Sequence, residues 1–455
     1  MKEVRILAPT GMMGYNIDQA AFDAGMAMKP HAIVADAGST DAGPQKLGAG
    51  VGVVSKMATM QDLDVMLTAG LANQIPIIIG SAGGSGGRPH IKWTMEAVEE
   101  LAQKKGWKLR VAVINATADK AWLKEKLAAG DIISMTGVPE LTDTEIDLAT
   151  EIVAQMGHEP YLEALSKGVD LIIAGRSYDP SMAVAACIHN GIENLGLAYH
   201  MGKIIECGTL WTIPGGNGPI MGIINDNSFA IQSLFPDKKA TPLSVAAHTL
   251  YEKSHPFLLP GPGGMLNLEL SSFEQLDNNA VRIRGSRFIP DKIYRVKLEG
   301  SKLAGYRTIF IGAVRDPIAV SAIDDLVGIA HYMADQTASS IGLNKDLYHI
   351  DLKVYGKNGV MGDREPIKNI STHELCVVGE IVAPTQEQAS AICSKVRAGM
   401  MHGPFEGRKS TAGNMAFPFA PSDFAVGATY QFNVYHLVAL DDPIAFFTTE
   451  YHNIG

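Results

Sequence analysis

Residues 75–84 read Ile75-Pro76-Ile77-Ile78-Ile79-Gly80-Ser81-Ala82-Gly83-Gly84, a β-branched apolar run that leads straight into a glycine-bearing turn. Four more segments before residue 210 have the same form: Val4-Arg5-Ile6-Leu7-Ala8 before Pro9-Thr10-Gly11, Ala32-Ile33-Val34-Ala35-Asp36 before Ala37-Gly38-Ser39-Thr40-Asp41, Val111 to Ile114 before Asn115, and Leu171-Ile172-Ile173-Ala174 before Gly175-Arg176-Ser177. This form predicts buried parallel strands that each end in a loop. Ligands of open α/β sheets lie beyond the carboxyl ends of such strands, so we expect a site among these loops.

Helical patterns separate the predicted strands. Apolar residues at helical spacing follow the first turn, and further helices are expected near residues 61–73, 92–105, 120–129 and 143–155. Strands that alternate with helices predict an α/β fold with a largely parallel sheet and helices on both of its faces.

The pattern changes after about residue 206, where two connections rich in proline and glycine occur at 214–219 and 260–264. Strands are then expected at 281–284, 294–298, 307–313, 349–355 and 375–382, with helices at 319–341 and 386–401. This order predicts a smaller α+β domain of antiparallel strands and two helices. We therefore expect an α/β ligand-binding domain over 1–240, the α+β domain over 241–405, and a C-terminal tail over 406–455 that docks on its own body or on a neighbouring subunit.

Composition narrows the function. The 455 residues are 46% apolar and 19% charged, with 38 basic and 48 acidic residues and a formal net charge of −10. Nucleic acid and membranes are not expected as partners, because no basic cluster and no apolar run of about 18 residues occurs. Four scattered cysteines without a disulfide or CxxC pattern favour a cytoplasmic location. A small anionic substrate remains compatible with the acidic chain.

The loop after the second strand carries two carboxylates and two hydroxyls: Asp36, Ser39, Thr40 and Asp41. This set is the best single candidate for catalysis, with Ser39 and Thr40 assigned to substrate binding. The alternative is that Asp36 or Ser39 only caps the next helix.

The glycine-rich loop at 80–87 opens a predicted helix, so its backbone amides can surround a phosphate or carboxylate. We assign Ser81, Gly83, Gly84, Arg88 and His90 to substrate binding, with Arg88 as a bidentate fork. The loop has neither the dinucleotide nor the Walker A spacing, and a lid without ligand contacts is the alternative.

The loop after the last of these strands offers Arg176, Ser177 and Asp179. Arg176 could hold a carboxylate or neutralise an enolate, or it could simply pair with Asp179. Asn115 ends the preceding strand and joins the substrate-binding set.

Glu206 and Cys207 add an acid and a thiol to the candidate catalytic residues, which also include Asp36, Asp41 and Asp179. Glu206 is favoured over Cys207 as general base, because lone cysteines near apolar runs are usually packing residues. No histidine spacing matches a metal site. No cofactor is expected to be required, although Asp36, Asp41 or Glu206 could hold a divalent cation such as magnesium through their oxygens.

The chain resembles the acyclic terpene utilisation (AtuA-like) family over almost its whole length. The resemblance rests on residues 4–14, 80–87, 172–176 with Asp179, 205–208 and 294–296, while residues 36–44 and 403–423 resemble a long subgroup. It implies a role in the catabolism of branched acids and terpenoids and a small companion subunit beside the chain or fused to it. Homo-oligomers are expected whichever function holds. A small branched carboxylate or its CoA thioester is the expected substrate.

Three functions follow. The leading one is a lyase, more specifically a hydratase (hydro-lyase), or a double-bond isomerase: Arg88, Arg176 and the amides of 83–87 hold the carboxylate while Asp41 and Glu206 transfer protons. The second is a hydrolase of a lactone, amide or thioester with Ser39 or Cys207 as nucleophile, although no G-x-S-x-G elbow is present. The third is a large subunit or binding module that is active only with a small partner protein.

Overall fold

The computed structural model describes residues 2–38, 43–251 and 254–455. The chain forms two compact units, Met1–Lys302 with Phe432–Gly455, and Leu303–Gln431. Two long strands, β15 (Arg295–Val314) and β18 (Asp423–Ala439), carry the chain from one unit to the other. The units divide after residues 302 and 431, whereas the sequence led us to expect domain boundaries after residues 240 and 405. The first boundary lies later than expected because strands between residues 272 and 284 extend the sheet of the first unit.

A mixed sheet organises the first unit. Among the described residues ten strands run in the order β12-β13-β9-β8-β1-β2-β3-β7-β4-β19. The parallel centre consists of β1 (Val4–Ala8), β2 (Ala32–Asp36), β3 (Ile77–Gly80), β7 (Leu171–Ala174) and β4 (Leu109–Ile114). Antiparallel strands complete it: β8 (Ile220–Asn225), β9 (Ser228–Ser233), β13 (Ala280–Arg284), β12 (Ser272–Gln275) and β19 (Thr449–Ile454). The five predicted strands are all present, but the sheet is parallel only at its centre.

Alternate residues of the central strands enter two separate cores. Val34 and Ile78 face a core formed with α7 (Glu159–Ser166), α8 (Ser181–His189) and α9 (Leu195–Ile205). Ile33 and Ile79 face the other core, formed with α1 (Gln19–Ala27), α3 (Lys56–Asn73) and α4 (Arg88–Lys105). The period of two along each strand therefore places helices on both faces of the sheet.

Smaller elements complete the first unit. They are α2 (Gly43–Ala49), α5 (Lys120–Ala128), β5 (Ile132–Ser134), α6 (Asp143–Leu148), β6 (Glu151–Ala154), the 3-10 helix η2 (Gly208–Trp211), α10 (Pro242–Thr249), β10 (Leu258–Gly261), β11 (Gly264–Asn267), β14 (Arg287–Pro290) and α14 (Pro443–Phe446). The helix expected over 143–155 is wrong in its second half, because Glu151-Ile152-Val153-Ala154 pairs with residues 298–301 of β15 instead.

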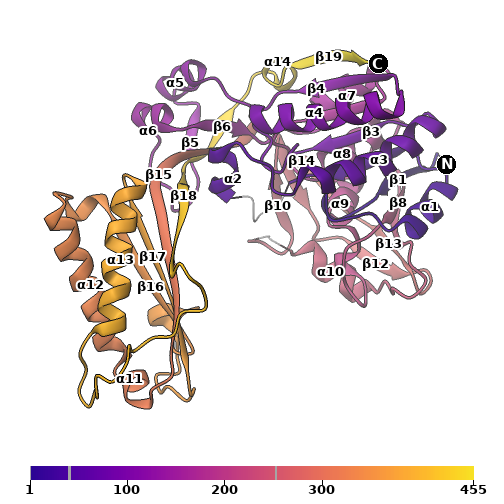
Figure 1. Cartoon of the computed structure of the whole chain (residues 1–455). Helices are drawn as coiled ribbons and strands as arrows, with labels where there is room; N and C mark the ends of the chain where they lie inside the picture. Colours follow the sequence, from indigo (N-terminus) through magenta and orange to yellow (C-terminus); the bar gives the residue numbers. More distant parts are fainter. Residues whose placement is uncertain (1, 39–42, 252–253) are drawn as a thin grey trace. The chain divides into compact units, whose positions relative to one another are not determined.

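The second unit is a sheet covered by two helices on one face. Its strands follow the order β16 (His349–Tyr355), β17 (Leu375–Ala383), β15 and β18, the last two with the parts that lie in this unit. β17 is antiparallel to both β16 and β15. Figure 1 shows α12 (Ile323–Ser340) and α13 (Gln386–His402) side by side on this sheet. The unit also contains α11 (Pro317–Ser321) and the short 3-10 helices Lys345–Leu347 and Gly362–Arg364, and it has a hydrophobic core of its own.

The last residues return to the first unit. Residues 436–438 of β18 pair with β5, and β19 then pairs along the whole of β4 at the sheet edge, which Figure 1 shows in yellow beside β4. The end of the chain thus docks on its own sheet. In the described part of the chain no helix is both long and apolar enough to cross a membrane.

Candidate functional site

The neighbouring strands β3 and β7 send the chain to opposite faces of the sheet. β3 leads to α4, which packs in one core, whereas β7 leads to α8, which packs in the other. Open α/β sheets bind ligands at the carboxyl end of the sheet near such a change of face. Here the loops after β3 and β7 contact each other, because the amides of Ser81 and Ala82 donate to the carbonyls of Gly175 and Ala174. The candidate site is at this end of the sheet.

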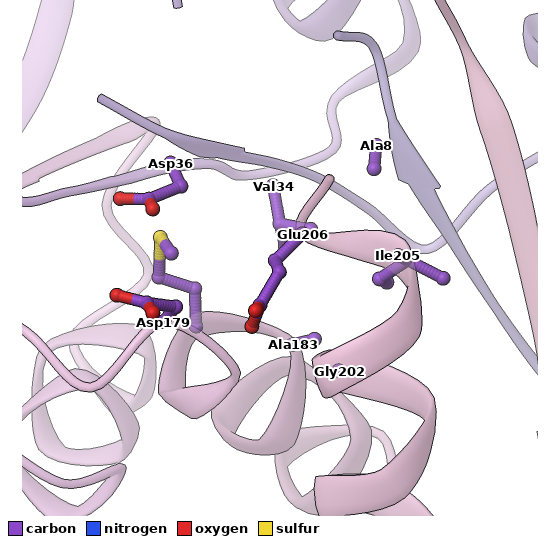
Figure 2. Close-up of a pocket in the computed structure, with 9 residues that line it drawn as sticks. Ala8, Val34, Asp36, Asp179, Ala183, Gly202, Ile205 and Glu206 are labelled. Carbon is purple, nitrogen blue, oxygen red and sulfur yellow. The ribbon is translucent and has the colours of Figure 1, made fainter. Parts of the chain in front are cut away.

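A small cavity lies beside it. It is lined by Ala8, Val34, Asp36, Asp179, Met182, Ala183, Gly202, Ile205 and Glu206. The volume of this cavity is about 10 Å³, which is room for about one water molecule. Figure 2 shows the carboxyl groups of Asp36 and Asp179 one above the other, with Glu206 beside them. Three acids from separate segments therefore meet at one cavity.

Asp36 is the last residue of β2 and lies on the same strand face as Val34. Its Oδ1 accepts a hydrogen bond from the Gly38 amide at 2.9 Å. Burial, followed by the charge of Asp179, raises the pKa of Asp36 to about 7, against the effect of the Gly38 amide. This carboxyl group can therefore release or take up a proton near neutral pH.

Arg176 holds together the groups behind the cavity. Its Nε donates to Glu299 Oε2 at 2.9 Å and its Nη1 to Ser81 Oγ at 3.1 Å, and Nη1 lies 3.6 Å from Asp179. Glu299 is also 2.5 Å from Lys297 Nζ. Burial would raise the pKa of Glu299, but Arg176 and Lys297 outweigh burial and lower it to about 2. Arg176 is thus fixed by protein partners on several sides.

Lys203 and Glu206 form a buried ion pair at the end of α9. Lys203 Nζ lies 2.5 Å from Glu206 Oε1, and the two side chains are only 2% and 5% exposed. Burial would lower the pKa of Lys203, but Glu206 and Asp179 outweigh it and raise that pKa. Lys203 therefore remains an ammonium ion and brings positive charge to the cavity.

The pairing of opposite charges around the cavity explains why the protonated form of Asp36 is favoured. The carboxylates of Asp179, Glu206 and Glu299 are in ion pairs with Arg176, Lys203 and Lys297. Asp36 is a fourth carboxyl group in the same region, and its charge would make the cluster net negative. An unmatched buried charge is costly, which favours the protonated form.

The glycine-rich loop is packed into the sheet end. The amides of Gly84 and Gly86 donate to the carbonyls of Ser81 and Ala82, so these two amides are engaged within the loop. A Cβ on Gly86, whose φ is +68°, would stand 2.1 Å from the backbone nitrogen of Arg176. Ser81 has φ +48° and its Oγ accepts from Arg176 and from the Ser177 amide. This loop positions Arg176, and the ligand contact of Gly83 stays a prediction.

A carboxylate of the protein already lies at the N-terminus of α4. Glu151 Oε1 accepts from the Arg88 amide at 3.3 Å and from Thr117 Oγ1 at 2.5 Å. The Arg88 side chain is exposed. His90 is buried, and its Nε2 lies 3.1 Å from the Lys46 carbonyl oxygen. The predicted anion position at this helix end is thus filled by Glu151.

The remaining predicted residues have local partners. Ser177 Oγ lies 2.5 Å from the hydroxyl of the buried Tyr161 and donates to the Gly175 carbonyl at 2.8 Å. Asn115 accepts from the Thr117 amide at 3.1 Å through its Oδ1. Burial, reinforced by Glu206, raises the pKa of the Cys207 thiol, which does not favour a thiolate nucleophile. Ser39, Thr40 and Asp41 lie outside the described residues.

Sequence reasoning missed Lys203, Lys297 and Glu299. Lys203 had a usable signal, because it is the single formally charged residue in the otherwise apolar segment 195–205. Glu299 gave none, since it alternates with apolar residues like a solvent-facing strand position and reaches Arg176 from 123 residues away. Within the described ranges no group of three or more His, Cys, Asp or Glu side chains is arranged to hold a metal ion.

Fold and site together define an α/β protein with a cluster of buried carboxyl and cationic groups at the end of its central strands. The chain belongs to the acyclic terpene utilisation family, because the family model described as "Acyclic terpene utilisation family protein AtuA" matches residues 56–419. The resemblance noted in the sequence is thereby confirmed. Asp36 precedes the matched segment, whereas Arg176, Asp179, Lys203, Glu206 and Glu299 lie within it. Searches of the curated proteins and of the solved structures found no match.

Proposed function

We propose that this protein transfers protons at carbon on a branched carboxylic acid or its CoA thioester, as a hydratase or double-bond isomerase in acyclic terpene catabolism. The pathway follows from the description of the family to which the chain belongs. The observation that carries the reaction class is the convergence of Asp36, Asp179 and Glu206 on one cavity, with Arg176 and Lys203 ion-paired beside it.

The proposed chemistry needs one group that both gives and takes a proton. In a double-bond shift, a carboxylate removes a proton from the γ carbon, the electron pair moves into a dienolate, and a carboxylic acid returns a proton at the α carbon. In hydration, water adds at the β carbon and the α carbon receives the proton. Asp36 suits this work because its pKa of about 7 leaves both forms populated at neutral pH.

The cations have a supporting part in this proposal. Arg176 and Lys203 are ion-paired beside the cavity, and in this proposal they offset part of the negative charge that passes from Asp36 to an enolate when Asp36 takes the proton. Glu206 then serves to hold Lys203, because its Oε1 lies 2.5 Å from the lysine nitrogen. The role of general base that the sequence suggested for Glu206 passes to Asp36, with Asp179 as its neighbour.

Asp36→Asn tests the proposal. We expect kcat to fall by about 10²-fold to 10⁴-fold, the usual contribution of a general acid or base, while a branched unsaturated acid still binds. Asp119→Asn is the matched control, since Asp119 caps α5 and asparagine caps equally well. Asp41→Asn belongs in the same series, because loss of turnover there with Asp36→Asn active would move the assignment to Asp41.

Several expectations from the sequence stay predictions. They are the homo-oligomer, the small companion subunit, the divalent cation at oxygen ligands and the cytoplasmic location. The hydrolase and the binding module remain the alternative functions, and full turnover by Asp36→Asn would favour them.

A further inference from the structure

The cavity beside Asp36 is smaller than the substrate proposed for it. The cavity volume of about 10 Å³ is roughly what a single water molecule needs. A branched carboxylic acid is larger than a water molecule and therefore enters this cavity only if a lining side chain moves. The question is which side chain can move.

Among the lining residues Met182 has the longest unbranched apolar side chain. Methionine has three flexible bonds and adapts its shape to a cavity at little cost. Asp36 and Glu206 are held by the Gly38 amide and by Lys203, respectively. The apolar remainder consists of Ala8, Val34, Ala183, Gly202 and Ile205, which are short or branched near the backbone. Met182 is thus the side chain best able to yield.

Met182 lines the cavity at the end of a central strand. Met182 Sδ and Cε lie 2.6 Å and 2.9 Å from the point where a Cβ on Gly80 would stand. Gly80 is the last residue of β3, which pairs with β7. The Tyr161 hydroxyl is 3.0 Å from the same point. The end of the methionine therefore packs against the last residue of β3, on the face of the sheet that α8 covers.

We propose that Met182 is a specificity-determining residue whose side chain occupies the place of the substrate's branched apolar end and turns away when substrate binds. This proposal rests on the proposed function, because it takes proton transfer beside Asp36 as the reaction. The size of the group at position 182 then sets the largest acyl chain that reaches Asp36.

The chain offers a matched control in Met201. Met201 is also fully buried and its Sδ lies 2.7 Å from the point where a Cβ on Gly222 of β8 would stand, but it does not line the cavity. Both substitutions to alanine remove the same atoms from the same hydrophobic core. Any general effect of loosening the core appears in both variants.

The first measurement is calorimetric titration of 3-methylbut-2-enoate into the wild type, Met182→Ala, Met182→Leu and Met201→Ala. We expect Met182→Ala to bind about tenfold more tightly, because no side chain has to be displaced and two methyl-sized groups of the acid are newly buried. Met182→Leu and Met201→Ala should resemble the wild type. Equal affinities of the two alanine variants overturn the assignment of Met182.

A second measurement observes the wild-type protein and needs only the conservative variant Met182→Leu, for assignment. With ¹³C-methyl methionine, the Met182 signal, assigned by its loss in Met182→Leu, should shift on addition of the acid while that of Met201 does not. An acid that binds without moving the Met182 signal overturns this proposal alone. Failure of the acid to bind any of the four proteins overturns the substrate class and the proposal with it, whereas the catalytic role of Asp36 is decided separately by turnover of Asp36→Asn.

Discussion

At the scale of single residues, the protein is governed by how buried charges are matched. Asp179, Glu206 and Glu299 have cationic partners, and Asp36 is left over with a pKa near 7. A residue of this kind costs stability in its charged form, which proteins accept at functional sites. The same imbalance that makes Asp36 a suitable acid or base should therefore be visible as pH-dependent stability.

The pH dependence has a definite sign. The folded pKa of Asp36, about 7, lies above its ordinary value of 3.8, so the folded state binds this proton more tightly between these two pH values. The stabilisation is complete below about pH 4 and is lost as the pH rises through 7. Urea unfolding of the wild type and of Asp36→Asn should show that the wild type becomes less stable relative to the variant from pH 5 to pH 9.

The control for this titration is Asp441→Asn, whose side chain is 97% exposed. It should show no such trend. If the stability difference between the wild type and Asp36→Asn were constant over this range, Asp36 would have an ordinary pKa.

At the scale of elements, the loop of residues 80–87 has a packing task in addition to the ligand contact expected of it, which stays a prediction. Its glycines allow close contact with the start of the loop after β7, rather than leaving all of its amides open to an anion. The residue before α4 is glycine, and the carboxylate at that helix end comes from Glu151. Close packing of two loops, and not ligand binding alone, explains why so many glycines occur here.

Gly86→Ala tests this account. Gly86 and Gly130 both have positive φ, +68° and +78°. A Cβ on Gly86 would stand 2.1 Å from the backbone nitrogen of Arg176, whereas, among the described residues, a Cβ on Gly130 would point into open space. Gly86→Ala should lose about 3 kcal/mol or more of unfolding free energy, through backbone strain together with a steric clash. Gly130→Ala should lose only about 1 kcal/mol.

The measurement is denaturant unfolding of both variants. Equal losses would mean that the loop can move away from Arg176. In that case the packing of the loop would not fix the position of the arginine.

At the scale of the whole molecule, the chain builds separate hydrophobic cores. The two cores of the first unit lie on either face of its sheet, while the second unit has a third core around Phe310. The site residues described above all belong to the first unit, Met1–Lys302 with Phe432–Gly455. The second unit can therefore be perturbed without direct damage to the site.

Phe310→Ala should lower the unfolding temperature of the second unit alone. Phe310 is fully buried there, and loss of a buried phenylalanine typically costs about 3–5 kcal/mol. Calorimetry should resolve two transitions, of which only one moves. The counterpart is Phe22→Ala in the first unit, which should move the transition of that unit. A single transition that both variants shift would show that the two units unfold together.

Much of the fold could be predicted from the sequence because its signals are local. The apolar and largely β-branched runs identify all five central strands, since strands buried on both faces need apolar residues at nearly every position. The helices that periodicity predicts near 61–73 and 92–105 are present, and each begins one turn earlier, at Lys56 and at Arg88. The prediction failed at 143–155, where Glu151-Ile152-Val153-Ala154 becomes a strand only because β15 is there to pair with it.

The sequence by itself determined the family, the strand ends at which the candidate site lies, and Asp36, Arg176, Asp179 and Glu206 as its candidates. Only the tertiary structure showed which of them meet at the cavity and which charged side chains pair with them. Glu299 reaches Arg176 across 123 residues, Lys203 pairs with Glu206 inside an apolar helix region, and Glu151 fills the helix end expected to bind the substrate. The reason is physical: a carboxyl group's pKa depends on burial and on charges a few ångströms away, and those neighbours are set by the fold rather than by distance along the chain.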